Sequence, residues 1–136
     1  MEAKELRIGN LVTDEWNSQV IKVDSIDDKG INLEIKDDGN YPELAKRWIE
    51  PCYKFECLYP IPLTEKLLLN FGFSKINYTH GYSFYTLSRS KINKCYIDIY
   101  DSSTKYMGYS VRHCKYVHQL QNLYFALTRE ELVFTE

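Results

Sequence analysis

The chain has 136 residues, of which 44% are hydrophobic, 26% charged and 15% aromatic, a composition that excludes a disordered tail. Its net charge of -2, from 17 basic and 19 acidic residues, is too small for a whole-molecule field that would attract nucleic acid or a membrane surface. No window of the sequence approaches the roughly 18 consecutive apolar residues that a membrane span needs.

The first 60 residues have the pattern of short β-strands. Apolar and polar residues alternate over residues 20–26 and 31–35, after an opening strand within residues 6–12. Residues 27–30 and 37–40 are rich in Asp, Asn and Gly, which favour turns. The pattern predicts a small bent sheet or an SH3-like barrel and does not separate these two shapes.

A proline-containing connector and a short helix come next. Pro60 and Pro62 favour extended backbone. Thr64 is a suitable N-cap, Glu65 lies where the helix dipole favours negative charge, and Gly72 is suited to end the helix. We therefore predict a short amphipathic helix between Thr64 and Gly72.

The remaining chain has the pattern of three strands and a longer helix. Alternating segments over residues 82–87, 95–100 and 106–111 predict an antiparallel sheet. Residues 116–127 have helical periodicity, with a core-facing stripe predicted at Tyr116, Val117, Leu120, Leu123, Tyr124 and Leu127. The four residues from Thr128 have the form of a capping box, so we expect either a new helical turn there or a short final strand over residues 132–134.

These elements predict an α+β fold. A small β-rich lobe would cover residues 1–59, and an antiparallel sheet with two helices would cover residues 60–136. At this length the two lobes are expected to form one cooperative unit.

Residues 1–7 are charged and contain no apolar stretch, so we expect no secretory leader and a cytoplasmic protein. In that compartment Cys52, Cys57, Cys95 and Cys114 would be reduced. Cys52 and Cys57 are too far apart in the sequence for the usual pair of zinc ligands. Cys114 and His118 could share one face of a helix, but no strong spacing signal joins them to other ligands. We expect no metal and no cofactor.

Three segments carry a resemblance: residues 5–10 (ELRIGN), 60–65 (PIPLTE) and above all 116–128 (YVHQLQNLYFALT). They resemble a family of small uncharacterised proteins found in Bacteroidetes bacteria, their prophages and their mobile elements. The resemblance implies a phage or mobile-element product in a bacterial host cytoplasm, and it carries over no catalytic residue. Relatives often have Gly after the final Thr, where this chain has Arg129.

The two halves of the chain differ in net charge and in tyrosine content, and the second half has a net positive charge and most of the tyrosines. Residues 1–60 hold 8 basic and 13 acidic side chains, whereas residues 61–136 hold 9 basic and 6 acidic ones. Nine of the 12 tyrosines lie between Tyr78 and Tyr124. The cations near the predicted strands are Arg89, Lys91, Lys94, Lys105, Arg112 and Lys115.

The function favoured by this pattern is non-enzymatic binding of a host protein or a small nucleotide-like ligand through a tyrosine-rich surface. Period-two alternation puts Tyr96, Asp98 and Tyr100 on the face opposite Ile97 and Ile99, unless a helix covers that face. The candidate contact residues are Tyr82, Tyr85, Tyr96, Tyr100, Tyr106, Tyr109 and Arg112, with His118 and Asn122 on the last helix. His118 is expected either to hold a structural position beside the core or to line a ligand groove.

Two alternatives stay open. Basic residues interleaved with aromatic rings are typical of single-stranded nucleic-acid-binding surfaces, where rings stack on bases. Asp24 followed by Glu34 and Lys36 matches the acidic and basic residues of metal-dependent nucleases, although Glu34 and Lys36 also fit the solvated face of a strand.

Overall fold

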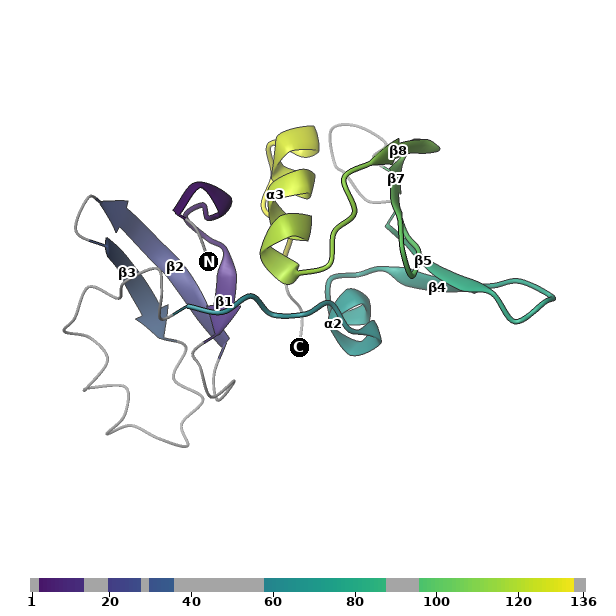
Figure 1. Cartoon of the computed structure of the whole chain (residues 1–136), viewed down its shortest axis with the longest axis horizontal. Helices are drawn as coiled ribbons and strands as arrows, with labels where there is room; N and C mark the ends of the chain where they lie inside the picture. The colour runs from purple at the N-terminus through teal and green to yellow at the C-terminus, as the bar shows by residue number, and fades with distance from the viewer. Residues whose placement is uncertain (1–2, 14–19, 28–29, 36–57, 88–95, 134–136) are drawn as a thin grey trace. The chain divides into compact units, whose positions relative to one another are not determined.

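Figure 1 shows the computed structural model of the chain, which describes residues 3–13, 20–27, 30–35, 58–87 and 96–133. The tertiary contacts divide the chain into Met1–Ile61, here unit 1, and Pro62–Glu136, here unit 2. The sequence pattern places the boundary between residues 59 and 60, in the same proline-containing connector.

Unit 1 contains a three-stranded antiparallel sheet of order β1-β2-β3. The elements are η1 (Ala3–Glu5), β1 (Leu11–Thr13), β2 (Val20–Asp27) and β3 (Gly30–Ile35). Tyr59 extends the pairing at the edge of β1, because Thr13 and Tyr59 exchange two backbone hydrogen bonds of 2.8 and 3.0 Å. Within the described residues β1 and β3 do not pair with each other, so the sheet is open and no SH3-like barrel closes.

Apolar side chains on this sheet form the core of unit 1. Val12, Ile21 and Val23 are at most 1% exposed, and they pack with Leu6 and Leu58. β1 begins later than the sequence pattern predicts. The reason is a turn over residues 7–10, in which the fully buried Asn10 accepts a 2.7 Å hydrogen bond from the backbone N–H of Arg7 through its side-chain oxygen.

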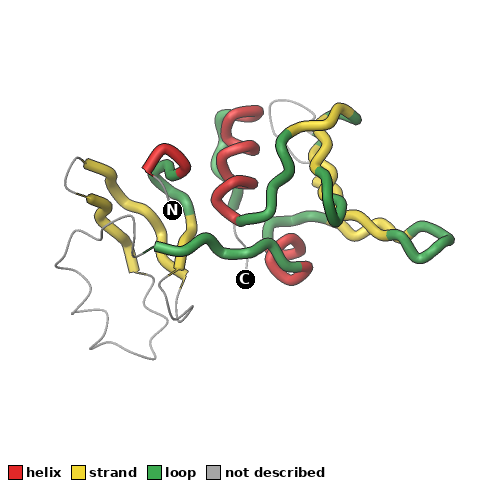
Figure 2. Tube along the Cα trace, in the orientation of Figure 1, coloured by secondary structure: helices red, strands yellow, loops and turns green. Residues whose placement is uncertain are grey.

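Unit 2 contains a five-stranded antiparallel sheet in which every strand pairs with the next along the chain. Figure 2 shows how short its strands are and how loops separate them. The elements are α2 (Glu65–Asn70), β4 (Ser74–Asn77), β5 (Ser83–Leu87), β6 (Ile97–Ile99), β7 (Thr104–Tyr106), β8 (Tyr109–Val111) and α3 (Val117–Thr128). The predicted α+β class is therefore confirmed: the described residues contain one open sheet in each unit and, in unit 2, the helices α2 and α3.

The caps predicted for α2 are confirmed. The Thr64 hydroxyl accepts a 3.3 Å hydrogen bond from the backbone N–H of Leu67. Gly72 has φ 90°, a left-handed conformation that glycine adopts without steric cost. This conformation lets the backbone N–H of Phe73 donate to the Leu68 carbonyl at 3.0 Å, so the helix ends here.

In unit 2 one strand was not predicted and one strand prediction is wrong. β4 was not expected, because all four of its residues are exposed and its sequence has no alternation of apolar and polar residues. The predicted strand over residues 106–111 is instead a hairpin of β7 and β8, turning at Met107 (φ 51°) and Gly108 (φ 84°). A two-residue hairpin turn of this type needs positive φ at both positions. Met-Gly is a weak turn signal, because only its second residue favours positive φ.

The strand register gives the sheet of unit 2 two unlike faces. Thr86, Asp98 and Lys105 are cross-strand partners on one face, which we call the open face. On the other face Leu87, Ile97 and Ile99 are at most 5% exposed. Figure 1 shows α2 and α3 on this second side of the sheet. No described helix is long and apolar enough to cross a membrane.

The buried face of α3 differs from the predicted stripe. Leu123 and Leu127 are only half-buried, whereas His118 and Gln121 are each 3% exposed. The buried residues of α3 are Val117, His118, Leu120, Gln121, Tyr124 and Thr128. The helix forms as predicted, but its buried face includes the polar residues His118 and Gln121. A pattern of hydrophobic residues does not select such positions.

The capping-box prediction at Thr128 is also wrong. Thr128 is the last residue of α3, and its hydroxyl donates to the Tyr124 carbonyl at 2.8 Å and accepts from the Glu130 N–H at 3.1 Å. Arg129 is the C-cap, with φ 59° and a 2.7 Å hydrogen bond from its N–H to the Phe125 carbonyl. No helical turn restarts there, and residues 132 and 133 are in no strand.

Because Arg129 holds a left-handed conformation, we expect Arg129→Gly to stabilise unit 2. A side chain with a β-carbon costs roughly 1–2 kcal/mol in this conformation, so the gain should be about 1 kcal/mol after the entropy cost of glycine. Urea unfolding followed by the NMR signals of α3 measures it. Arg129→Ala is the control, since it removes the guanidinium but keeps the β-carbon. An equal gain in both variants would show that the charge, and not the backbone, is responsible.

Candidate functional site

The open face of unit 2 carries a row of three aromatic rings and one cation. The rings of Tyr78 and Phe84 stack with centroids 5.5 Å apart, and those of Phe84 and Tyr100 with centroids 4.9 Å apart. The ammonium of Lys105 lies 5.2 Å from the centroid of the Tyr100 ring. We call these four residues the aromatic row. Tyr78 follows β4, Phe84 is in β5, Tyr100 follows β6 and Lys105 is in β7, so the row crosses the sheet.

This arrangement determines which parts of the rings face outward. Phe84 has a ring on each side and is only 9% exposed. Tyr100 has Phe84 on the side of β5 and Lys105 on the side of β7. The faces of these two rings are therefore occupied within the row, and their edges, with the Tyr100 hydroxyl, point outward. Burial, followed by the charge of Asp98, raises the pKa of Tyr100, so its hydroxyl stays protonated at neutral pH.

A shallow groove of about 420 Å³ lies beside the aromatic row. Its lining is Phe84, Thr86, Tyr96, Asp98, Met107 and Gly108. Tyr96 is 39% and Met107 48% exposed, which makes them the most exposed large side chains of the groove. The backbone N–H of Met107 donates to the Tyr96 carbonyl at 2.9 Å, so the hairpin turn and Tyr96 are held together. The groove thus has a fixed apolar rim and one carboxylate, that of Asp98.

The structure distributes the predicted contact residues over several places. Tyr96 and Tyr100 lie on the open face, as period-two alternation predicts, and no described helix covers that face (Figure 1). The register puts Tyr85 and Tyr106 on the opposite face. The others are at hairpin ends (Tyr82 and Tyr109, 76% and 78% exposed), in the segment before α3 (Arg112, exposed) or on α3 (His118, buried; Asn122, half-buried).

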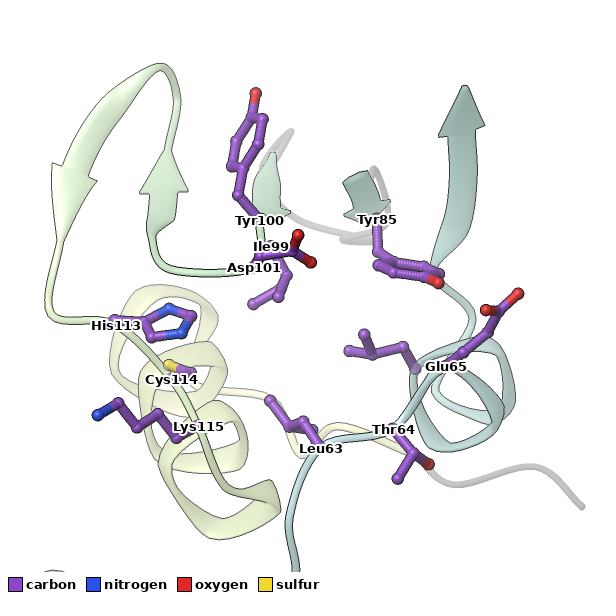
Figure 3. A pocket seen from close by; sticks show the side chains of 11 residues that line it. Leu63, Thr64, Glu65, Tyr85, Ile99, Tyr100, Asp101, His113, Cys114 and Lys115 are labelled. Carbon is purple, nitrogen blue, oxygen red and sulfur yellow. The ribbon is translucent and has the colours of Figure 1, made fainter. Parts of the chain in front are cut away.

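A second concave site lies on the helix-facing side of unit 2 (Figure 3), and we call it the α2 cavity. Its volume is about 360 Å³. Leu63, Leu68 and Ile99 supply apolar surface. The polar and charged side chains around it are Thr64, Glu65, Tyr85, Tyr100, Asp101, His113, Cys114 and Lys115, so Tyr100 borders both this cavity and the aromatic row.

One wall of the α2 cavity is an ion pair with a tyrosine beside it. The Lys75 ammonium lies 3.2 and 3.3 Å from the two carboxylate oxygens of Glu65. The Tyr85 hydroxyl, followed by Lys75, lowers the pKa of Glu65. In Figure 3 the Tyr85 hydroxyl points toward that carboxylate. Glu65 is therefore ionised at neutral pH and already has a cationic partner.

The opposite wall is built around Thr104, which is fully buried. Its hydroxyl oxygen accepts the backbone N–H of Cys114 at 3.0 Å and lies 3.0 Å from Nδ1 of His113. Burial raises the pKa of the Cys114 thiol to about 11, so the thiol stays protonated near neutral pH and is a poor nucleophile. This wall positions His113 without activating Cys114.

Several sequence hypotheses fall on residues outside the described ranges. Cys52, Cys57, Cys95, Arg89, Lys91, Lys94 and Lys36 lie there, as do the side chains of Asp24 and Glu34. Among the described residues, no group of three or more His, Cys, Asp or Glu side chains could hold a metal ion. The hypothesis of a metal-dependent nuclease thus stays a prediction.

No family model matches the chain, and neither a curated protein nor a solved structure matches it. The resemblance to prophage and mobile-element proteins stays a prediction as well. The candidate sites rest on the geometry of unit 2 alone.

Residues that the structure places at these sites and that sequence reasoning missed include Tyr78, Phe84, Met107, Asp101 and His113. Phe84 and Tyr100 meet through pairing of β5 with β6, and the register of strands 10 or more residues apart is not readable from one sequence. Met107 was assigned to a strand and lies in a turn. Asp101 follows β6 and had no sequence signal beyond its charge.

Proposed function

We propose that this chain is a non-enzymatic protein-binding module whose partner docks on the open face of unit 2. The observation that carries the proposal is the groove beside the aromatic row, where Tyr96 and Met107 are exposed and joined by a backbone hydrogen bond. Exposed tyrosine and methionine held by a rigid backbone are typical of the central contacts of protein interfaces. The suggested setting is a phage or mobile-element product that binds a host protein in the bacterial cytoplasm.

The arrangement of the rings favours a protein over a single-stranded nucleic acid. Base stacking needs free ring faces, and in the row the faces of Phe84 and Tyr100 are taken by neighbouring groups, which leaves the outer face of the exposed Tyr78. Phosphates need several cations, and the described part of the row and groove contains one lysine and one aspartate. Ring edges with hydroxyls suit hydrogen bonds and apolar contact with a polypeptide.

The chemistry of the groove indicates what the partner presents. Phe84, Tyr96 and Met107 make an apolar rim that would accept one large apolar side chain. Asp98 would pair with a lysine or arginine of the partner next to that side chain. We therefore propose a partner segment that carries a large apolar residue beside a basic one.

A photo-crosslinking amino acid at Tyr96 is expected to capture the partner in host lysate, and Tyr96→Ala should then weaken binding of the purified partner at least tenfold. Central aromatic contacts are worth about 2 kcal/mol or more, which supports this magnitude. Biolayer interferometry measures the affinity. Tyr109→Ala is the matched control, because Tyr109 is more exposed but lies on the other face by register. Its affinity should change less than twofold.

Two results would contradict the proposal. One is equal weakening by Tyr96→Ala and Tyr109→Ala, which would mean that the groove is not the contact. The other is binding of single-stranded DNA or RNA that falls steeply with salt and is lost in Tyr96→Ala. That outcome would favour the nucleic-acid hypothesis for the same face.

A further inference from the structure

We propose that the α2 cavity binds a small organic cation, namely a primary ammonium group on a short apolar body. None of the residues that line the groove of the proposed protein contact lines this cavity, although Tyr100 of the aromatic row borders it. The inference rests on the charge left unpaired in the cavity, on its apolar surface and on its size.

The unpaired charge is the carboxylate of Asp101. Asp101 is exposed, and among the described residues it has no ion-pair partner. Figure 3 shows its carboxylate turned toward the middle of the cavity. Glu65 is already paired with Lys75, and the side chain of Lys115 leads away from the cavity (Figure 3). The group that fits this arrangement is a cation at Asp101.

The surface around Asp101 suits an ammonium group with an apolar body. The ring of Tyr85 lines the cavity but already has the Lys75 ammonium 5.9 Å from its centroid, so the ammonium group of a ligand would depend on Asp101. Leu63, Leu68 and Ile99 line the cavity, and the half-buried Leu63 has the most surface left to contact the apolar body of the ligand. An anion would instead meet the Asp101 carboxylate with no described cation turned toward the cavity.

The volume restricts the ligand to a small molecule. Small-molecule sites usually measure roughly 300–1,000 Å³, so a cavity of about 360 Å³ is near the lower end of that range. An amine with a short alkyl chain would occupy part of this space and leave room for water, so the volume sets an upper bound on the ligand and the charge of Asp101 selects its type. The wall at Thr104 holds His113 at the edge of this space through the 3.0 Å contact with Nδ1.

The test is an NMR titration of the whole chain with n-pentylammonium, with pentanol and pentanoate as matched probes. We expect saturable amide shifts at Ile99, Asp101 and His113 with n-pentylammonium in the millimolar range, and at least tenfold weaker binding of the two other probes. Asp101→Asn should weaken binding of n-pentylammonium at least fivefold. Asp98→Asn, on the open face, should change it less than twofold.

The proposal is wrong if pentanoate binds as well as n-pentylammonium, if no probe gives saturable shifts, or if Asp101→Asn binds as the native chain does. Asp101 is exposed and lies outside the strands, so the amide spectrum of Asp101→Asn should keep the native dispersion. If Asp101→Asn does not keep the native spectrum, the titrations of the native chain with the three probes are the test. Selective binding of n-pentylammonium would support the proposal, and equally strong binding of pentanoate would overturn it. The protein-binding proposal is unaffected by either result.

Discussion

Replacing Ile97 by Ala is expected to lower the free energy of unfolding of unit 2 by about 2–5 kcal/mol. Ile97 is fully buried in β6, between Leu87 and Tyr106 in the register of the sheet. Removing its side chain loses the transfer free energy of three carbons and leaves a cavity that neighbouring strands fill only in part. Urea unfolding followed by the NMR signals of β5, β6 and β7 measures the change where it occurs. Both tryptophans precede residue 60, so their fluorescence is not a probe of unit 2.

Ile76→Ala is the matched control for Ile97→Ala. Ile76 lies in the edge strand β4 and is 38% exposed, so its truncation should cost less than about 1 kcal/mol. Equal effects of the two substitutions would mean that β6 is not the centre of the core of unit 2. That result would also remove the basis for assigning the open face and the helix-facing side.

Replacing Thr104 by Val is expected to destabilise unit 2 by about 1–3 kcal/mol, although the two side chains have nearly the same shape. The Thr104 hydroxyl is fully buried and accepts the backbone N–H of Cys114, which is itself buried. Valine would leave that N–H without an acceptor in an apolar environment. It would also release His113, whose Nδ1 lies 3.0 Å from the same oxygen. The same urea experiment measures the stability, and the imidazole signals of His113 report its release.

Two further variants separate the hydroxyl from the methyl group of Thr104. Thr104→Ser keeps the hydrogen bond and should cost only about 1 kcal/mol, the contribution of one buried methyl group. Thr86→Val, on the neighbouring strand β5 and half-buried on the open face, should change stability by less than about 0.5 kcal/mol. If Thr104→Ser were as harmful as Thr104→Val, packing and not hydrogen bonding would explain the result.

Local patterns in the sequence were sufficient to predict the positions of those strands and helices that have clear alternation, caps or turn residues. β2 and β3 alternate cleanly, and α2 has an N-cap at Thr64 and a positive-φ glycine at Gly72, so their positions were predicted closely. The same reasoning failed where the signal was weak. β4 is exposed throughout, the turn at Met107 lacks the usual Asn or Asp, and the αL cap of α3 is an arginine.

The sites depended on contacts between segments far apart in the chain. Alternation alone placed Tyr96 and Tyr100 on the face opposite Ile97, because side chains alternate along any strand. It could not show that Phe84 would lie between Tyr78 and Tyr100, since that depends on the register of β4, β5 and β6. Nor could it show that Glu65 and Asp101 would share a cavity.

By itself, the sequence determined that this chain is an α+β protein of near-neutral charge whose second half has most of the tyrosines and a net positive charge. Composition, turn residues and periodicity are local properties, so one sequence suffices to read them. The tertiary structure decided that the tyrosines are divided between two faces, and that on the open face Phe84 and Tyr100 stack on each other whereas Tyr96 stays exposed. The physical reason is register: a shift of one residue between paired strands would exchange the two faces, and the register comes from packing against a common core.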